Sequence, residues 1–164
     1  MKYELVKTDT KQFCGRTLYR IRALVAIGSL IAPNDLGGYI ESEKNLSQMS
    51  DNAWVYDNAQ VFDDARVFGN ARVSGDARVS KQSQWLLIGP AKSSGRFTTA
   101  FVDEKLGVRV VCGCFTGTIA EFSEQIEKSH KDNKEHLEQY RLFCQLIGFN
   151  FEVQQRAQLQ EAPL

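Results

Sequence analysis

The sequence lacks net charge and a long apolar run, and we expect no export signal. Its 20 Lys and Arg residues balance 20 Asp and Glu residues, so generic binding to nucleic acid or to an anionic membrane is not expected. The apolar run at residues 23–32 is far shorter than the ~20 residues that a transmembrane helix needs. The charged residues 1–6 do not resemble a secretory leader. We therefore expect a cytosolic protein without a membrane partner.

Cysteine and histidine are scarce, with four Cys and two His. Without an export signal, we expect reduced thiols. The best metal candidate combines Cys112, Cys114 and His130, because thiolates and imidazole suit Zn²⁺. It is weak, since structural zinc sites usually space their cysteines by two to four residues and need a fourth ligand. The alternatives are a buried pair facing one side of a strand and a reactive thiol. No cofactor is predicted.

Residues 52–81 consist of five consecutive six-residue repeats, NAWVYD, NAQVFD, DARVFG, NARVSG and DARVSK. One register is always valine, at Val55, Val61, Val67, Val73 and Val79. Alanine stands two residues before each valine, and Asn, Asp or Gly fills the positions between the strands. Those residue types tolerate left-handed turn geometry. Each repeat thus predicts a short strand with an inward valine and a tight corner, which together form a β-solenoid.

This pattern resembles left-handed hexapeptide-repeat proteins, in which three strands form one triangular coil and residues 18 apart stack. The resemblance implies a parallel β-helix of about two coils over residues 46–87. Met49 and Trp85 would extend the valine register at either end. Such a short solenoid needs capped ends or subunit association to be stable. We therefore expect a homo-oligomer or capping by the flanking segments.

The flanking segments predict a fold that is mainly β with some α. Residues 1–45 read as a β-hairpin region and cap, with strands at residues 1–7 and 17–24. Residues 88–150 read as a ββαα module, with strands at residues 97–103 and 108–115. Its helices begin at capping boxes that pair Thr118 with Glu121 and Asp132 with Glu135. Gly148 is a predicted helix stop, and residues 151–164 form a polar tail.

The outward positions of the repeats are the candidate binding surface. Its members are aromatic or basic: Trp54, Tyr56, Phe62, Arg66, Phe68, Arg72 and Arg78. Exposed aromatic residues on a small domain need covering. One interpretation is that flanking modules or a sister subunit cover them. The other is a partner-binding surface, because aromatic residues and arginine are enriched at interface hot spots. The neighbouring Glu41 and Glu43 are expected to be solvated rather than catalytic.

Four segments together resemble an uncharacterised family of accessory proteins from tailed phages and prophages. They are TLYRIRAL, DLGGYIESEKNLS, the NAWVYDNAQV-type repeats and the VVCGCFTGTIAEF segment. The resemblance covers about residues 3–148 and implies a viral protein that acts in the host bacterial cytosol. It brings no catalytic residues.

The leading hypothesis is therefore a non-enzymatic protein that binds and inhibits a host protein, plausibly a component of an anti-phage defence system. The first alternative is an oligomeric sponge for a nucleotide signal, with arginine pairing phosphate. The second is a hexapeptide-repeat acyltransferase that uses His130 or His136 as its base. The third is a phage structural protein. A zinc anhydrase of this fold needs three histidines, which this chain lacks.

Overall fold

The structure, a computed structural model, describes the backbone of residues 1–161 and the side chains of residues 1–152. It is mixed β with two helices and has no closed sheet. The chain divides into two compact units, Met1–Trp85 with Phe101–Gly107, and Leu86–Ala100 with the chain from Val108 onward. Among the described residues, no helix is long and apolar enough to cross a membrane.

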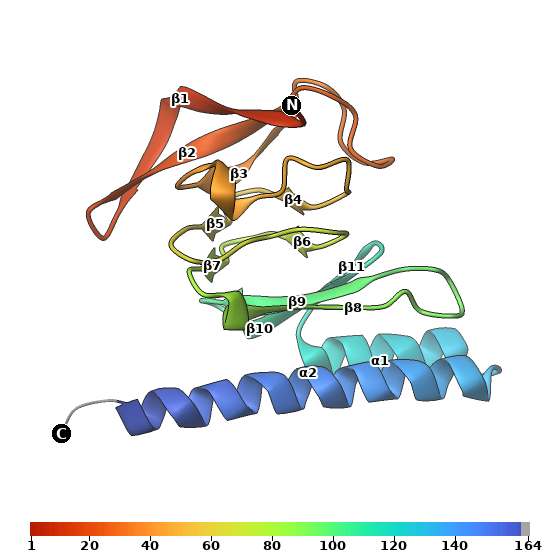
Figure 1. Cartoon of the computed structure of the whole chain (residues 1–164). Coiled ribbons are helices and arrows are strands. Elements are labelled where there is room, and N and C mark those ends of the chain that lie inside the picture. Colours follow the sequence, from red (N-terminus) through yellow and green to blue (C-terminus); the bar gives the residue numbers. More distant parts are fainter. Residues whose placement is uncertain (162–164) are drawn as a thin grey trace. The chain divides into compact units, whose positions relative to one another are not determined.

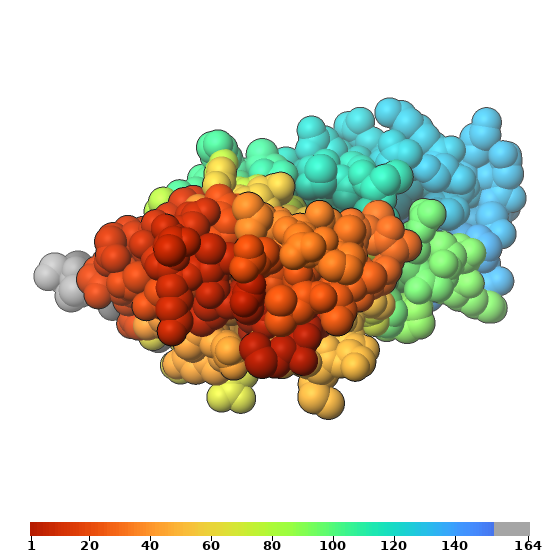
Figure 2. Space-filling view, turned by 90° about the horizontal axis from the view of Figure 1, so that it is seen from above, coloured from red at the N-terminus to blue at the C-terminus, as the bar shows by residue number. Residues whose placement is uncertain are grey.

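The first unit begins with an antiparallel hairpin of β1 (Tyr3–Phe13) and β2 (Arg16–Ala23). Cys14 and Gly15 form its turn, both with positive φ. The predicted hairpin is confirmed, although β1 is longer than expected and shifts register between Val6 and Thr10. In Figure 1, this hairpin lies at one end of the first unit, and Figure 2 shows that end covered by the hairpin and by the orange segment after it.

The repeats form short strands, and each paired strand lies parallel to the strand three repeats further along the chain. The strands of the first unit that follow the hairpin are β3 (Leu36–Ile40), β4 (Trp54–Val55), β5 (Gln60–Val61), β6 (Arg72–Val73) and β7 (Arg78–Val79). Val55 pairs with Val73 and Val61 with Val79. All five repeat valines and all five repeat alanines are buried. The predicted inward register is therefore confirmed.

The register changes before the first repeat. Ile40 pairs with Val61 and Leu46 bridges to Val67. In both pairs the partners are half a repeat further apart along the chain than the paired valines of the later strands. Leu46 is buried, whereas Met49 is 75% exposed. The prediction that Met49 continues the valine register is therefore wrong, because the longer connection from Leu46 to the first repeat pushes Met49 out into a corner. At the other end, Trp85 is buried as expected.

Hydrogen bonds hold this enlarged corner in place. The Asp51 carboxylate pairs with Lys2 Nζ at 2.7 Å and accepts a bond from Gly69 N at 2.9 Å. Burial opposes ionisation of Asp51, but its hydrogen bonds with Lys2, Ser47 and Gly69 outweigh it and lower the pKa of the carboxyl. The buried Asn45 lies just before the corner, and its amide donates to Asp63 O and Ala65 O at 3.0 and 2.9 Å.

Two glycines allow β3 to lie close to the repeats. A Cβ at Gly37 would stand 2.5 Å from Val55 O, and one at Gly38 would stand 2.5 Å from Ala59 O. Real side chains do not tolerate such distances to backbone atoms. β3 then joins the repeats to the hairpin in one sheet of order β1-β2-β3-β5-β7, in which β2 and β3 are antiparallel and β3 and β5 are parallel.

The strands after the repeats are β8 (Trp85–Ile88), β9 (Thr98–Asp103), β10 (Gly107–Cys112) and β11 (Phe115–Gly117), in the sheet order β11-β10-β9-β8. The two short 3-10 turns η1 (Glu43–Asn45) and η2 (Gln82–Gln84) precede Leu46 and Trp85, respectively. The sequence predicts strands at residues 97–103 and 108–115, and a last solenoid strand at Trp85. β11 was missed because Gly113 breaks the expected strand at residues 108–115 with a positive φ.

Two helices follow, α1 (Ile119–His130) and α2 (Lys134–Glu161). The capping box of Thr118 and Glu121 is confirmed. The second predicted box is wrong, because Asn133 Oδ1 accepts the bond from His136 N at 3.1 Å. Gly148 does not stop α2, which runs through residues 151–161 of the predicted polar tail; residues 162–164 lie outside the described residues. Buried apolar residues on both sides of Gly148, including Ile147 and Phe151, carry the helix across it.

Candidate interaction surface of the solenoid

The hairpin covers two of the aromatic residues that the repeats were expected to expose. Trp54 is fully buried, and its ring meets the Tyr3 ring edge-on at a centroid distance of 6.2 Å. Phe62 is buried against Phe13 at 5.3 Å, in a cluster with Leu18 and Tyr39. For Trp54 and Phe62 the structure therefore agrees with the interpretation that a flanking segment covers them, and neither ring belongs to an exposed binding surface. Apolar side chains of β1 and β2 pack against the repeats and shield both rings from water.

Three further members of the predicted surface are half-buried: Tyr56, Arg72 and Arg78. Trp54 and Arg72 are directly paired between β4 and β6. Burial raises the pKa of Tyr56, against the opposing effect of Arg72. The Arg78 guanidinium lies 4.5 Å from the centre of the Phe13 ring and forms an ion pair with Glu104. These side chains already serve contacts within the first unit.

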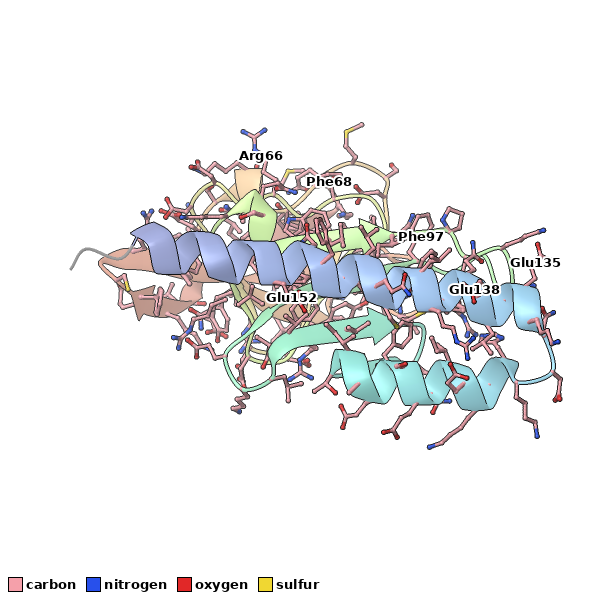
Figure 3. The ribbon with its side chains drawn as sticks, turned by 90° about the horizontal axis from the view of Figure 1, so that it is seen from below. Arg66, Phe68, Phe97, Glu135, Glu138 and Glu152 are labelled. Atoms are coloured by element: carbon pink, nitrogen blue, oxygen red, sulfur yellow. The ribbon has the colours of Figure 1, made fainter. Side chains whose placement is uncertain are left out.

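Arg66 and Phe68 are the two predicted surface residues that stay exposed. They flank the buried Val67, so alternation along the strand directs both outward. Phe68 is 51% exposed, although its ring packs in a T-shaped arrangement against the Trp85 ring, at a centroid distance of 5.2 Å. Within the described chain, no carboxylate lies in ion-pair distance of the Arg66 guanidinium. Figure 3 shows the Arg66 side chain extending away from the ribbon.

The local backbone gives this pair a fixed base. Val67 N donates to Asn45 O at 2.9 Å, and Ser47 N donates to Val67 O at 2.9 Å. The Arg66 backbone N donates to Gln82 Oε1 at 3.1 Å. Hydrogen bonds with Asn45, Ser47 and Gln82 thus hold the main chain of the Arg66–Phe68 segment. A partner would therefore meet both side chains on a backbone that is already held in place.

The candidate metal ligands are not brought together. Gly113 forms a turn between β10 and β11, so Cys112 is buried whereas Cys114 is exposed. The expectation that both sulfurs share one face is therefore wrong. His130 stacks on Tyr140 at 5.1 Å and lies 5.9 Å from His136. Over the part of the chain that the structure describes, no three His, Cys, Asp or Glu side chains are grouped to hold a metal.

Glu41 is a structural residue, whereas Glu43 is exposed. Glu41 accepts a bond from Asp63 N at 2.8 Å and pairs with Arg16 at 2.9 Å. The backbone bond from Asp63, helped by Arg16, lowers the pKa of the Glu41 carboxyl. Arg16 also pairs with the Asp63 carboxylate at 2.9 Å. The hairpin is thereby tied to a solenoid corner. The expectation of a solvated side chain holds for Glu43 but not for Glu41, which is half-buried.

Residues 59–75 match a family model described as YdcK Beta solenoid repeat. The match lies within the repeats and covers only a small part of the chain. It supports a β-solenoid repeat, in agreement with the parallel pairing of strands three repeats apart. None of the curated proteins matches the chain.

Asn45 and Asp51 were missed as important polar residues. Asn45 occurs in the segment that leads into the repeats, and Asp51 immediately precedes the first repeat. Asx residues at turns are common, so nothing in the pattern set these two apart. Their roles depend on partners far along the chain: Asp63 and Ala65 for Asn45, and Lys2 and Gly69 for Asp51.

Proposed function

We propose that this protein is a non-enzymatic binding protein that uses its β-solenoid wall to engage another protein. The observation that carries the proposal is the exposed pair of Arg66 and Phe68 on a wall held by backbone hydrogen bonds. Arginine and aromatic residues are enriched at interface hot spots. Covering the exposed half of Phe68 would contribute roughly 1 kcal/mol, about half the value for burying a whole apolar side chain.

The scaffold in this proposal is a left-handed parallel β-helix of about two coils. Support comes from the six-residue period, from parallel pairing of strands three repeats apart, and from left-handed corner residues. Asp57, Asp63, Gly69 and Gly75 all have φ between 54° and 71°. A coil that contains β3 precedes the regular part, with its offset enlarged by half a repeat.

The partner we propose is a host protein, plausibly a component of an anti-phage defence system, which the chain would bind and inhibit in the bacterial cytosol. This part rests on the resemblance of three segments and the repeats to phage and prophage accessory proteins. A small binding protein with an ordered, uncovered surface fits such a role, because inhibition by binding needs no catalytic group.

Self-association through α2 is the second part of the proposal. Leu142, Leu146 and Phe149 are all exposed and follow one another by four and three residues, so they form one stripe on the helix. At 100° per residue this stripe lies opposite the face that buries Ile147 and Phe151. With 28 residues against 12, α2 extends well beyond α1, as Figure 1 shows. A second copy of α2 would cover the stripe.

The test of the binding surface is capture of a host protein from bacterial lysate by the tagged full-length chain. Arg66→Glu and Phe68→Ser are each expected to reduce the captured amount at least tenfold. Lys81→Glu is the matched control, because Lys81 is also an exposed basic residue of the repeats and the change of charge is the same.

The result that supports the proposal is a stoichiometric host protein that Lys81→Glu captures and the other two variants lose. Equal capture by all four proteins would place the contact elsewhere and refute the surface. Absence of any stoichiometric partner from lysates of susceptible hosts would refute the binding function. Circular dichroism of each variant shows whether the fold is retained.

A further inference from the structure

A polar cavity in the first unit is lined by a lysine that has no ion-pair partner among the described residues. The cavity, about 260 Å³ in volume, is lined by Lys11 of β1, Asn58, Gln60 of β5 and Arg78 of β7, together with two ion pairs. Those pairs join Arg78 to Glu104 and Lys105 to Asp76. Three basic and two acidic side chains thus surround one space.

Lys11 differs from the other two cations of the cavity. Its ammonium contacts Asn58 Oδ1 at 3.2 Å and lies 4.2 Å from the centre of the Tyr39 ring. Among the described residues, no carboxylate is within ion-pair distance of Lys11 Nζ. Desolvation, followed by the positive charge of Arg20, lowers the pKa of Lys11.

The nearest acids are already paired with other cations. Asp9 accepts from Arg20 Nε at 2.8 Å and from the Tyr39 hydroxyl at 3.0 Å. The Arg20 guanidinium lies over the same Tyr39 ring as Lys11, at 4.4 Å from its centre. Two cations on one ring repel each other, so an anion beside Lys11 would relieve an unfavourable interaction.

A second, independent observation points to a ligand. Gln60 is only 8% exposed, and its Oε1 has no hydrogen-bond partner in the described part of the chain. A buried amide oxygen without a partner is unfavourable by about 1–3 kcal/mol. Since the amide oxygen and nitrogen exchange places on rotation, Gln60 can offer either an acceptor or a donor. A protonated oxyanion, which has both kinds of group, would satisfy it.

We infer that the cavity beside Lys11 binds a phosphate group, with the Lys11 ammonium and the Asn58 and Gln60 amides as its polar contacts. A phosphate group that keeps a proton offers negative charge to Lys11, acceptor oxygens to the amide N–H groups and a P–OH donor to an amide oxygen. A carboxylate supplies the charge without the donor. The phosphate can be free or part of a nucleotide, and this site is independent of the Arg66–Phe68 surface.

The experiment is a titration of the full-length, ¹⁵N-labelled chain with inorganic phosphate at constant ionic strength, followed by NMR. Saturable shifts are expected for the amides of Asn58 and Gln60. Lys11→Met should weaken binding at least tenfold, whereas Lys11→Arg, which keeps the charge, should retain most of it. Lys7→Met is the matched control on the same strand, because Lys7 is exposed and does not line the cavity.

Parallel titrations with adenosine monophosphate and adenosine distinguish the two sources. Tighter binding of the nucleotide than of inorganic phosphate, with none of adenosine, assigns a nucleotide ligand. Equal or weaker binding of the nucleotide assigns free phosphate. The inference is overturned if phosphate produces no saturable shift, if sodium chloride produces the same shift, or if Lys11→Met binds as the folded wild type does.

Discussion

Replacing Asn45 by alanine should destabilise the first unit more than any other single change of a corner Asn. The Asn45 Nδ2 group donates to Asp63 O at 3.0 Å and to Ala65 O at 2.9 Å, and its Oδ1 accepts from Ser42 N at 3.0 Å. The side chain is buried, so water does not replace it. At about 1 kcal/mol each, these three bonds give a loss of roughly 3 kcal/mol in the free energy of unfolding. A fourth, longer bond from Ser42 Oγ to Asn45 Oδ1 at 3.3 Å adds little, because water can reach the half-buried Ser42 hydroxyl.

Asn52→Ala is the matched control. Asn52 occupies a corner of the first repeat, but it is exposed and donates one side-chain bond, to Asn70 Oδ1 at 2.9 Å. Water can replace that bond, so we expect a loss below about 0.5 kcal/mol. Asn45→Asp should destabilise at least as strongly as Asn45→Ala, because it removes both donors and places a charge in a buried site.

The assay is urea unfolding followed by tryptophan fluorescence. Both tryptophans, Trp54 and Trp85, belong to the first unit, so the signal reports that unit. With a denaturant slope of about 1.5 kcal/mol/M, a loss of about 3 kcal/mol lowers the midpoint by roughly 2 M. Ellipticity at 222 nm follows the two helices of the second unit. Equal midpoints for Asn45→Ala and Asn52→Ala would refute the argument.

Other predictions concern backbone packing, titration and association. Gly38→Ala should lower the free energy of unfolding by about 1–3 kcal/mol in the fluorescence assay, because its Cβ would stand 2.5 Å from Ala59 O. By contrast, Gly148→Ala, with open space around its Cβ, should stabilise α2 by about 0.5–1 kcal/mol, seen in thermal unfolding by circular dichroism. The pKa of Asp51 is lower in the folded state, so the stabilisation by its carboxylate is complete above the unfolded pKa of about 4 and is lost as pH falls through the folded pKa. Asp51→Asn should therefore weaken the pH dependence of the urea unfolding midpoint between about pH 5 and 2. Leu146→Glu should convert an α2-mediated dimer to monomer in sedimentation equilibrium, and a wild type that is already monomeric would contradict the association.

The repeats were predictable from the sequence because local physics determines them. A valine in every repeat and a small alanine two residues before it define the buried positions, and the Asn, Asp and Gly corners define the turns. The enlarged offset before the first repeat was not predictable in this way. Leu46 and Met49 are both apolar, and the choice between them depends on bonds made by Asn45 and Asp51 to distant segments.

The candidate surface was less predictable than the fold. Alternation correctly directs Trp54 and Phe62 away from the repeat valines, but it cannot reveal that Tyr3 and Phe13 cover them. Likewise, Gly148 has the local character of a helix end, whereas the helix continues because apolar residues on both sides of it are buried. In each case contacts made far along the chain overrode a valid local preference.

The junction of antiparallel β2 with parallel-paired β3 has a consequence for polymerisation. An uncapped stack of parallel strands presents free backbone groups on which another chain can assemble into a filament. Here the strand next to the stack runs in the opposite direction, and β1 beyond it shifts register between Val6 and Thr10. A chain arriving at this edge meets neither the direction nor the repeat period of the solenoid. The hairpin thus acts as a built-in terminator of fibre growth at this end.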